Sequence, residues 1–328
     1  MILEALGWCE RHRAELTAHA DEGLVPGRVV AEHRSHYRVA TDLNELTAGT
    51  TGSLRNSAVQ RSDLPGVGDF VGVRLAAGDG PATIEVVLPR TTALVRKASG
   101  ERQPQLLAAN VDVVFIVTAA DGDLNLPRIE RYLALVRESG AAPVIVLNKA
   151  DLAEDVGETT RQIAAIAPGA PVYAISARDR EGVQGLERYF AGSQTVGFIG
   201  SSGVGKSTLT NELLGRAAQA TQEVRAHDSR GRHTTTHRQL FLRSQGGSII
   251  DTPGMRGLEL WNAGENVGND FDDIEGLATG CKFRNCRHDS EPGCAVRAAV
   301  GRGELEPKRL ASYIKFASPV RVSPRKAS

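Results

Sequence analysis

The chain of 328 residues has little of what marks secreted or membrane-embedded proteins. It contains four cysteines, three of them crowded between Cys281 and Cys294. This spacing fits a reducing compartment and a metal site better than a disulfide framework. No stretch approaches the roughly eighteen consecutive apolar residues of a membrane helix, and the N-terminus lacks a basic start followed by an apolar run. We therefore expect a soluble, cytoplasmic protein.

The chain also lacks an excess of either charge. Lys and Arg total 39, as do Asp and Glu, so the formal net charge is 0. No global basic field points to nucleic acid, and any such surface must be local. Hydrophobic residues make up 41% of the composition, and the length allows two or three domains with cores of their own.

The most informative stretch is a glycine-rich loop between a predicted strand at 195–199 and a predicted helix at 207–214 that ends at Gly215. The loop consists of Gly200, Ser201, Ser202, Gly203, Val204, Gly205, Lys206, Ser207 and Thr208. Backbone N–H groups of such a loop point at a β-phosphate, and glycines allow its close approach. Lys206 would reach the β- and γ-phosphates, and Ser207 would bind Mg²⁺. The alternative is a chance match among 35 glycines, which the flanking strand and helix disfavour.

Strands and helices alternate ahead of this loop, which favours a mostly parallel sheet covered by helices on both faces. The predicted strands span 111–118, 143–147 and 171–175, and the predicted helices span 127–139, a segment through Ile163, and 183–190. The second strand leads into Asn148, Lys149, Ala150 and Asp151, and the third into Ser176 and Ala177.

These two loops suit recognition of guanine. The Asp151 carboxylate can accept hydrogen bonds from the guanine N1–H and its exocyclic amino group, a pair that adenine does not offer. Asn148 would brace the loop and the purine edge, Lys149 would lie over the base plane, and the Ala177 N–H would meet the guanine O6. The alternative is an ordinary surface loop, which the Ser-Ala pair one helix and one strand later disfavours.

The motif order is unusual, because base recognition precedes the phosphate loop. Ordinary small GTPases run in the opposite order, so we predict a circularly permuted domain. Permutation is physically allowed, since the ligand contacts come from loops at one edge of the sheet.

Residues after the phosphate loop fit the two switches of a GTPase. Thr235 or Thr236 would supply a Mg²⁺ ligand, and a polar loop without a role is the alternative. Paired strands are predicted at 239–243 and 247–250; Asp251 would then hold the Mg²⁺ shell, and the Gly254 N–H would sense the γ-phosphate.

Position 255 lacks the water-orienting glutamine of many GTPases, since Met255 has no suitable donor or acceptor. Slow intrinsic hydrolysis is therefore expected. His233 and Arg256 are the local candidates for a catalytic group, and a partner could order the switch or supply a group in trans.

Two regions precede the nucleotide motifs. Residues 1–23 predict one amphipathic helix, residues 24–96 a small closed β-barrel, and the polar stretch between 92 and 107 a linker. An oligonucleotide-binding barrel would use basic side chains on backbone phosphates, and a solvated face is the alternative reading. These side chains are Arg28, Arg34, His36, Arg38, Arg55 and Arg61.

The C-terminal part carries a metal-ligand pattern formed by Cys281, Cys286, His288 and Cys294. Three thiolates and one imidazole suit a closed, structural Zn²⁺ site, with inert buried cysteines or a disulfide as alternatives. The neighbouring basic residues are Lys282, Arg284, Arg287 and Arg297, which would suit contact with RNA. A helix at 305–316 and a basic tail at 320–326 follow.

Taken together, these motifs resemble the ribosome small-subunit-dependent GTPase A (RsgA) family, most specifically in joining permuted order to the Cys/Cys/His/Cys knuckle. The resemblance runs from about Leu24 onward. It implies a multidomain chain: an OB-fold barrel at 24–96, a permuted α/β P-loop GTPase domain at 97–262, and a small α-helical zinc domain at 263–328.

The resemblance also implies GTP or GDP, Mg²⁺ and one structural Zn²⁺ as cofactors. It implies the small ribosomal subunit and its rRNA as partners, with GTP hydrolysis stimulated by the subunit during late maturation. We expect a monomer. The alternatives are a zinc-delivery GTPase and an RNA-binding nucleotide switch with little turnover.

Overall fold

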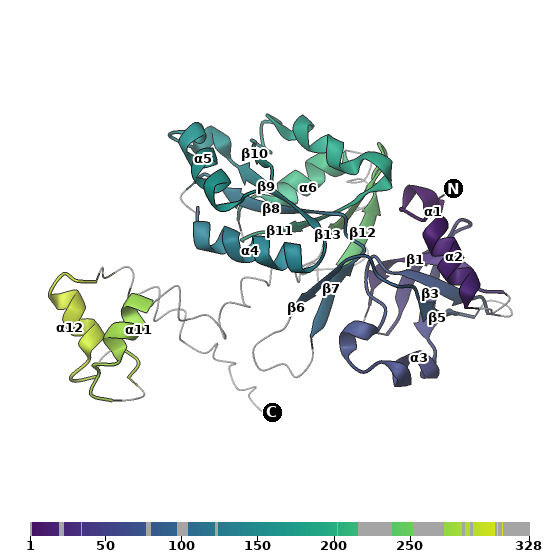
Figure 1. The fold of residues 1–328 in the computed structure, drawn as a ribbon, viewed down its shortest axis with the longest axis horizontal. Coiled ribbons are helices and arrows are strands. Elements are labelled where there is room, and N and C mark those ends of the chain that lie inside the picture. The colour runs from purple at the N-terminus through teal and green to yellow at the C-terminus, as the bar shows by residue number, and fades with distance from the viewer. Residues whose placement is uncertain are drawn as a thin grey trace, which may run out of the picture. The chain divides into compact units, whose positions relative to one another are not determined.

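The computed structural model divides the chain into two compact units, Met1–Glu259 and Leu260–Ser328 (Figure 1). The structure describes residues 2–19, 23–33, 35–76, 80–96, 104–121, 124–201, 203–215, 238–251, 272–283, 286–288, 291–305, 307 and 310. In this part of the chain no helix combines the length and apolarity needed to cross a bilayer.

One continuous sheet of eleven strands underlies the first unit, in the order β10-β9-β8-β11-β13-β12-β1-β2-β3-β5-β4. The strands are β1 (Val25–Glu32), β2 (Tyr37–Ala40), β3 (Glu45–Thr50), β4 (Phe70–Arg74), β5 (Ala82–Val87), β8 (Val113–Ala119), β9 (Ala142–Asn148), β10 (Val172–Ala174), β11 (Thr195–Ile199), β12 (Arg238–Leu242) and β13 (Ser248–Asp251). Because β1 pairs with both β2 and β4, the second half of the sheet closes into a barrel of five strands.

The first half is parallel except for β12 and has helices on both faces. These are α4 (Leu126–Glu138), α5 (Val156–Ile166), η3 (Val183–Ser193) and α6 (Lys206–Leu214). Every residue of β8 is buried, as a strand covered on both sides requires. Phe115 of β8 packs in one core with Leu186 of η3 and Leu209 of α6, whereas α4 packs on β8 and β9 from the opposite face (Figure 1). The predicted alternation of strands and helices is confirmed.

The barrel has a core of its own, formed by Val29, Val39, Val71, Val73 and Ile84 together with small alanines. The sequence missed β3 and the short helix α3 (Gly52–Ser57) that follows it. The side chain of Thr51 caps α3 by accepting from the Leu54 N–H at 3.0 Å.

Arg28 of β1 was expected on the barrel surface, and this prediction is wrong. Its side chain is 1% exposed and donates to three backbone carbonyls, those of Leu6, Gly68 and Asn110. Burial, opposed by the charges of Asp112 and Asp69, lowers the pKa of its guanidinium to about 10. Arg28 therefore joins the N-terminal segment, the barrel and the start of β8.

The same junction contains a glycine that no other residue could replace without movement. Gly68 has φ +96°, and a Cβ placed on it would lie 2.0 Å from the carbonyl oxygen of Ala109. The Ala109 N–H in turn donates to the Val67 carbonyl at 2.9 Å. Backbone thus touches backbone between the barrel and the segment that enters β8.

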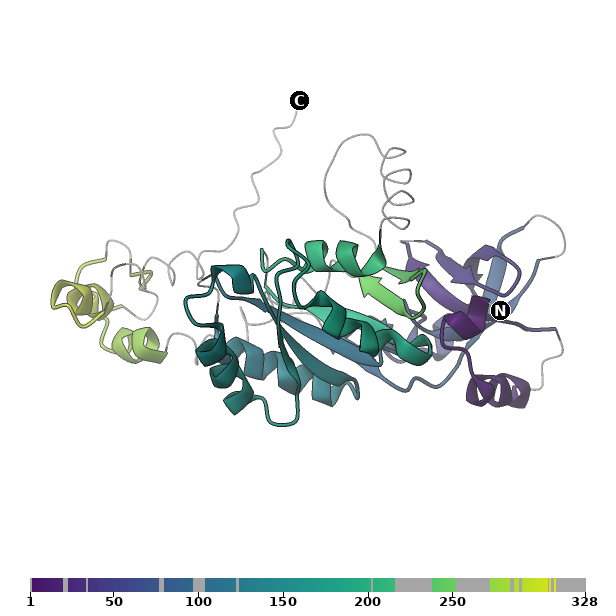
Figure 2. The same cartoon turned by 90° about the horizontal axis from the view of Figure 1, so that it is seen from above.

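The N-terminal segment forms two helices, not the single amphipathic helix expected. They are α1 (Ile2–Ala5) and α2 (Glu10–Ala18), which lie beside the barrel (Figure 2). The helical path is interrupted at Gly7, which has φ +86°. The ring of His12 then packs at a tilt against the ring of Phe70 in β4, with 3.9 Å between the ring centroids.

The expected linker between 92 and 107 is also wrong where the structure describes it. Its ends form an antiparallel pair of strands, β6 (Ala93–Arg96) and β7 (Gln105–Ala109). Residues 97–103, whose polar composition suggested the linker, lie outside the described residues.

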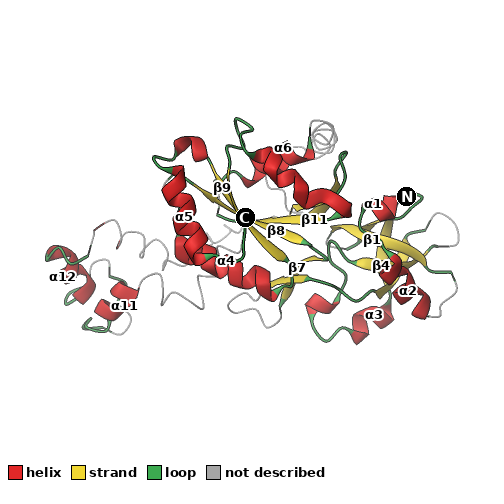
Figure 3. Cartoon of the chain, turned by 45° about the horizontal axis from the view of Figure 1, so that its top comes forward, coloured by secondary structure: helices red, strands yellow, loops and turns green. Residues whose placement is uncertain are grey.

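Among its described residues the second unit is helical and contains no strand (Figure 3). It holds α11 (Asp272–Ala278) and α12 (Ala295–Gly301). Ile274, Val296 and Ala299 form its small core with Leu305 and Leu310. Most of the helix predicted at 305–316 lies outside the described residues.

Candidate functional site

The sequence motifs gather at one edge of the parallel sheet. Asn148 ends β9, Ile175 and Ser176 follow β10, and Gly200 follows β11. Since β8, β9, β10, β11 and β13 run parallel, their carboxyl ends share this edge, and Asp251 at the end of β13 belongs to it as well. Ligands of open α/β sheets bind at this edge.

Asn148 connects three loops. Its amide Nδ2 donates to the Val204 carbonyl at 2.8 Å, and its Oδ1 accepts from the Ala177 N–H at 3.0 Å. The side chain is 3% exposed. The loop expected to recognise the base, the Ser-Ala loop and the phosphate loop are therefore held by one buried amide.

The Ala177 N–H was expected to face a guanine O6, whereas here it donates to Asn148. Ser176 is held by its own loop, because its hydroxyl donates to Asp179 Oδ2 at 2.8 Å. The Ala150 N–H donates to the Ile175 carbonyl at 3.0 Å and so ties the two base loops together. Asp151, next in the chain, is exposed at the sheet edge.

The phosphate loop has the backbone that its glycines predict. Gly200, Gly203 and Gly205 have φ of +147°, +84° and +95°. A Cβ on Gly200 would lie 2.1 Å from the Val117 carbonyl oxygen, and one on Gly205 would lie 2.2 Å from Asn148 Nδ2. These glycines permit both the positive φ and the close approach of neighbouring atoms.

The side chain of Lys206 folds into the loop, where its ammonium donates to the carbonyls of Gly200 and Ser201. It is 9% exposed, at the first residue of α6, while Ser207 and Thr208 next to it are exposed. The loop thus surrounds a buried cation at the start of a helix, which is an arrangement suited to a phosphate.

Several residues named from the sequence lie outside the described residues. They are Arg34, Ser202, His233, Thr235, Thr236, Gly254, Met255, Arg256 and Arg284. The strands β12 and β13, which lie between the expected switches, are described and pair with each other, as predicted; the pairing is antiparallel.

The structure also brings to the base loop a residue that the sequence did not reveal. Asp121 Oδ2 lies 2.5 Å from Lys149 Nζ, although the two residues are 28 positions apart in the chain. Only the pairing of β8 with β9 juxtaposes them, so no local pattern could have found Asp121.

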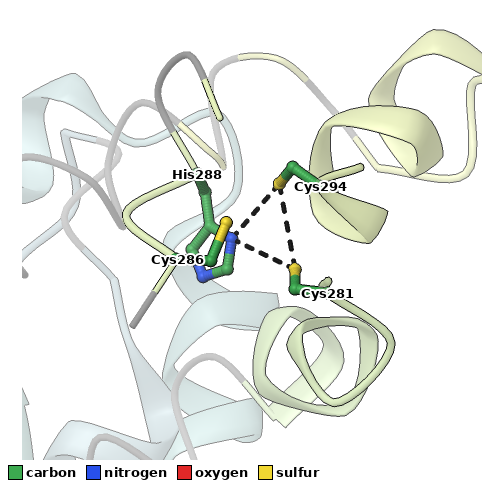
Figure 4. Close-up of side chains that lie close together, drawn as sticks. All are labelled: Cys281, Cys286, His288 and Cys294. Carbon is green, nitrogen blue, oxygen red and sulfur yellow. Dashed lines mark hydrogen bonds between the residues drawn. The ribbon is translucent and has the colours of Figure 1, made fainter. Parts of the chain in front are cut away.

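In the second unit, Cys281, Cys286, His288 and Cys294 converge (Figure 4). Their ligand atoms all lie within 4.8 Å of one another. His288 has φ +60°, and Cys294 is the N-cap residue before α12, where its sulfur accepts from the Arg297 N–H at 3.4 Å. The Lys282 N–H donates to the Gly293 carbonyl at 3.1 Å and joins the two ligand-bearing segments.

The spacing of these atoms fits tetrahedral coordination of a metal ion. Cys281 Sγ and Cys294 Sγ are 3.9 Å apart, and His288 Nδ1 lies 3.6 and 3.3 Å from them. A tetrahedron with Zn–S near 2.3 Å and Zn–N near 2.0 Å separates its ligands by about 3.5–3.8 Å.

The thiols of the cluster differ in pKa. Desolvation and the nearby sulfurs of Cys294 and Cys281 raise the pKa of the Cys286 thiol to about 11, against a backbone hydrogen bond that lowers it. For the Cys281 thiol, desolvation is outweighed by backbone hydrogen bonds from Val296 and Ala295, which lower its pKa. A divalent cation among the sulfurs would favour the thiolates instead. Cys9, the remaining cysteine, is exposed in the first unit.

Comparison with known proteins agrees with this geometry. The family model described as RsgA GTPase matches residues 87–261. A Small ribosomal subunit biogenesis GTPase RsgA of Opitutus terrae is 45% identical over 326 residues, with 96% of this chain and 89% of the relative covered. A Small ribosomal subunit biogenesis GTPase RsgA 2 of Lactiplantibacillus plantarum is 44% identical, with 93% and 85% covered.

A solved structure is similar over nearly the same span. The crystal structure of YjeQ from Thermotoga maritima superimposes with a TM-score of 0.54 at 26% sequence identity, covering 89% of this chain and 97% of that one. Because the family model matches more than half of the chain and the Opitutus terrae relative is similar over nearly all of it, the chain belongs to the RsgA GTPase family.

Proposed function

We propose that this protein hydrolyses GTP during late maturation of the small ribosomal subunit, and that binding the subunit and its rRNA stimulates turnover. The observation that carries the nucleotide part is the buried Asn148 amide, which joins the base loops to the phosphate loop. The relatives named for small ribosomal subunit biogenesis support the cellular role, which would be performed in the cytoplasm, where ribosomes mature.

Guanine would be read by the base loops. Asp151 would accept from N1–H and the exocyclic amino group, and Lys149 would cover the ring face, as proposed from the sequence. The Ala177 N–H, which donates to Asn148 Oδ1 at 3.0 Å, would meet the guanine O6 as well. Ser176 would hold this loop through Asp179.

The phosphates would occupy the loop from Gly200 to Thr208. There the Lys206 ammonium would exchange its bonds to two loop carbonyls for bonds to phosphate oxygens. Ser207 and Asp251 would hold Mg²⁺, which supplies charge neutralisation at the β- and γ-phosphates. We keep Thr235, Thr236 and Gly254 as the proposed switch residues and His233 as a candidate catalytic group.

Cys281, Cys286, His288 and Cys294 would hold one structural Zn²⁺. The donor set and its spacing fit this ion, and four protein ligands leave no open position for catalysis. Binding would stabilise a unit whose apolar core is small. The barrel at 24–96 and the second unit are the proposed rRNA-binding parts of a monomer.

Turnover of GTP by the purified protein, with and without isolated small ribosomal subunits, tests this proposal. Stimulation by subunits that Lys206→Ala abolishes is the expected result. Tight GTP binding with turnover unaffected by subunits would contradict it. Labile zinc would then favour a zinc-delivery GTPase, and firmly held zinc an RNA-binding switch with little turnover.

A further inference from the structure

The ion pair between Asp121 and Lys149 lies beside the proposed base site and is not part of any sequence motif. Ala120 donates its N–H to the Asn148 carbonyl at 3.0 Å, so the β8–β9 pairing continues to the end of β9. This places Asp121 directly beside Lys149, and the carboxylate lies 2.5 Å from the ammonium. Both side chains are 30% exposed.

Lys149 has a constrained backbone as well. Its φ of +59° and ψ of +37° are left-handed, which is uncommon for a residue with a Cβ. Its carbonyl accepts from the Leu152 N–H at 2.9 Å, and Asn148 before it is bonded to the phosphate loop. The backbone of Lys149 is therefore held, and the ion pair holds the other end of its side chain.

When the backbone and the ammonium of a lysine are both held, the methylene groups between them form an ordered apolar surface against which a ligand can pack. A free lysine side chain loses much rotamer freedom when a ligand packs against it, and that loss weakens binding. An ammonium anchored before the ligand arrives has already lost part of this freedom.

We propose that Asp121 is a positioning residue for guanine nucleotides: it anchors the Lys149 ammonium so that the lysine stem is ordered against one face of the purine ring before the nucleotide binds. The inference rests on the proposed placement of Lys149 over the base. Asp121 should therefore affect the affinity for the purine ring but not the preference for guanine, because Asp151 would read the edge of the base.

Calorimetric titration of the full chain with GDP and with IDP tests this role. IDP keeps the purine ring and N1–H of GDP but lacks the exocyclic amino group that Asp151 would read. The variants are Asp121→Asn, Asp121→Glu and Lys149→Met, the last of which keeps a methylene stem without the ammonium. Glu85→Gln is the matched control, because Glu85 forms a comparable exposed pair with Arg74 in the barrel, at 2.7 Å.

We expect Asp121→Asn to weaken GDP and IDP binding equally, by about threefold to tenfold, and Asp121→Glu to restore most of the loss. In the Lys149→Met background the Asp121→Asn change should alter affinity less than about twofold, since the two residues act as one unit. Glu85→Gln should leave both affinities unchanged.

Three results would overturn the inference: unchanged GDP affinity in Asp121→Asn, an undiminished loss in the Lys149→Met background, or a fall in the preference for GDP over IDP. The last would mean that the whole base loop had been disturbed. ADP separates this inference from the proposed function. A wild-type protein that does not prefer GDP to ADP refutes the guanine site itself, whereas a guanine-specific protein indifferent to Asp121→Asn refutes only the role of Asp121.

Discussion

Replacing Gly205 by alanine tests whether the Asn148 bridge controls nucleotide binding. Gly205 lies at the N-terminal end of α6 with φ +95°, and an added Cβ would lie 2.2 Å from Asn148 Nδ2. Ordinary contact needs more than 3 Å, so the amide must move by about 1 Å. It then loses its bonds to the Val204 carbonyl at 2.8 Å and to the Ala177 N–H at 3.0 Å.

The magnitude follows from these two bonds. A net intramolecular hydrogen bond contributes about 1 kcal/mol, and buried partners left unpaired add to the loss. Together the two bonds amount to about 2–3 kcal/mol of the conformation that binds the nucleotide. This corresponds to GDP affinity about 30-fold to 150-fold weaker than in the wild type.

Fluorescence titration with a labelled GDP measures this affinity, and thermal unfolding checks that the variant is folded. The matched control is Gly169→Ala, because Gly169 has φ +79° with no atom within 4 Å of an added Cβ. The control should bind GDP as the wild type does. In an Asn148→Ala background, Gly205→Ala should add little. Folded Gly205→Ala that binds GDP within about threefold of the wild type would refute the reasoning.

Three further predictions concern the rest of the molecule. Gly68→Ala should lower the free energy of unfolding, measured by urea denaturation, by about 3 kcal/mol or more, because its Cβ would lie 2.0 Å from a backbone oxygen. Gly169→Ala should lower it by about 1 kcal/mol. Equal losses in the two variants would contradict this prediction. Cys286→Ser should abolish the one equivalent of Zn²⁺ measured after acid release, and it should reduce the helical circular dichroism signal. Cys9→Ser should retain the Zn²⁺. Zinc retained by Cys286→Ser would contradict the proposed ligand set. Burial, with a smaller effect of neighbouring positive charge, lowers the folded-state pKa of His12 below 6.5, so the unfolded chain binds more protons and stability should fall as the pH drops below about 6.5. The midpoints of urea denaturation at pH 7.5 and pH 5.5 should therefore differ more in the wild type than in His12→Gln. An equal difference in the two proteins would show that His12 is not responsible.

Local patterns predicted most of the nucleotide domain. The buried runs that became β8, β9 and β11 contain consecutive apolar residues, and such runs identify strands covered on both faces. The N-terminal helix was wrong at Gly7, because the pattern of leucines continued while the backbone turned to a positive φ. The predicted linker was wrong because the residues at its two ends pair as strands β6 and β7, although the residues between these strands are polar.

The sequence by itself predicted the chemistry of the site, because the phosphate loop, the Asn-Lys-x-Asp loop and the proposed zinc ligands each depend on closely spaced residues. Only the tertiary structure decided which distant residues serve them. Arg28 is a basic residue in a strand and so resembles a surface residue; it is buried because carbonyls from three separate segments meet its guanidinium. Asp121 meets Lys149 for the same kind of reason, since strand pairing removes a separation of 28 residues that no local pattern spans.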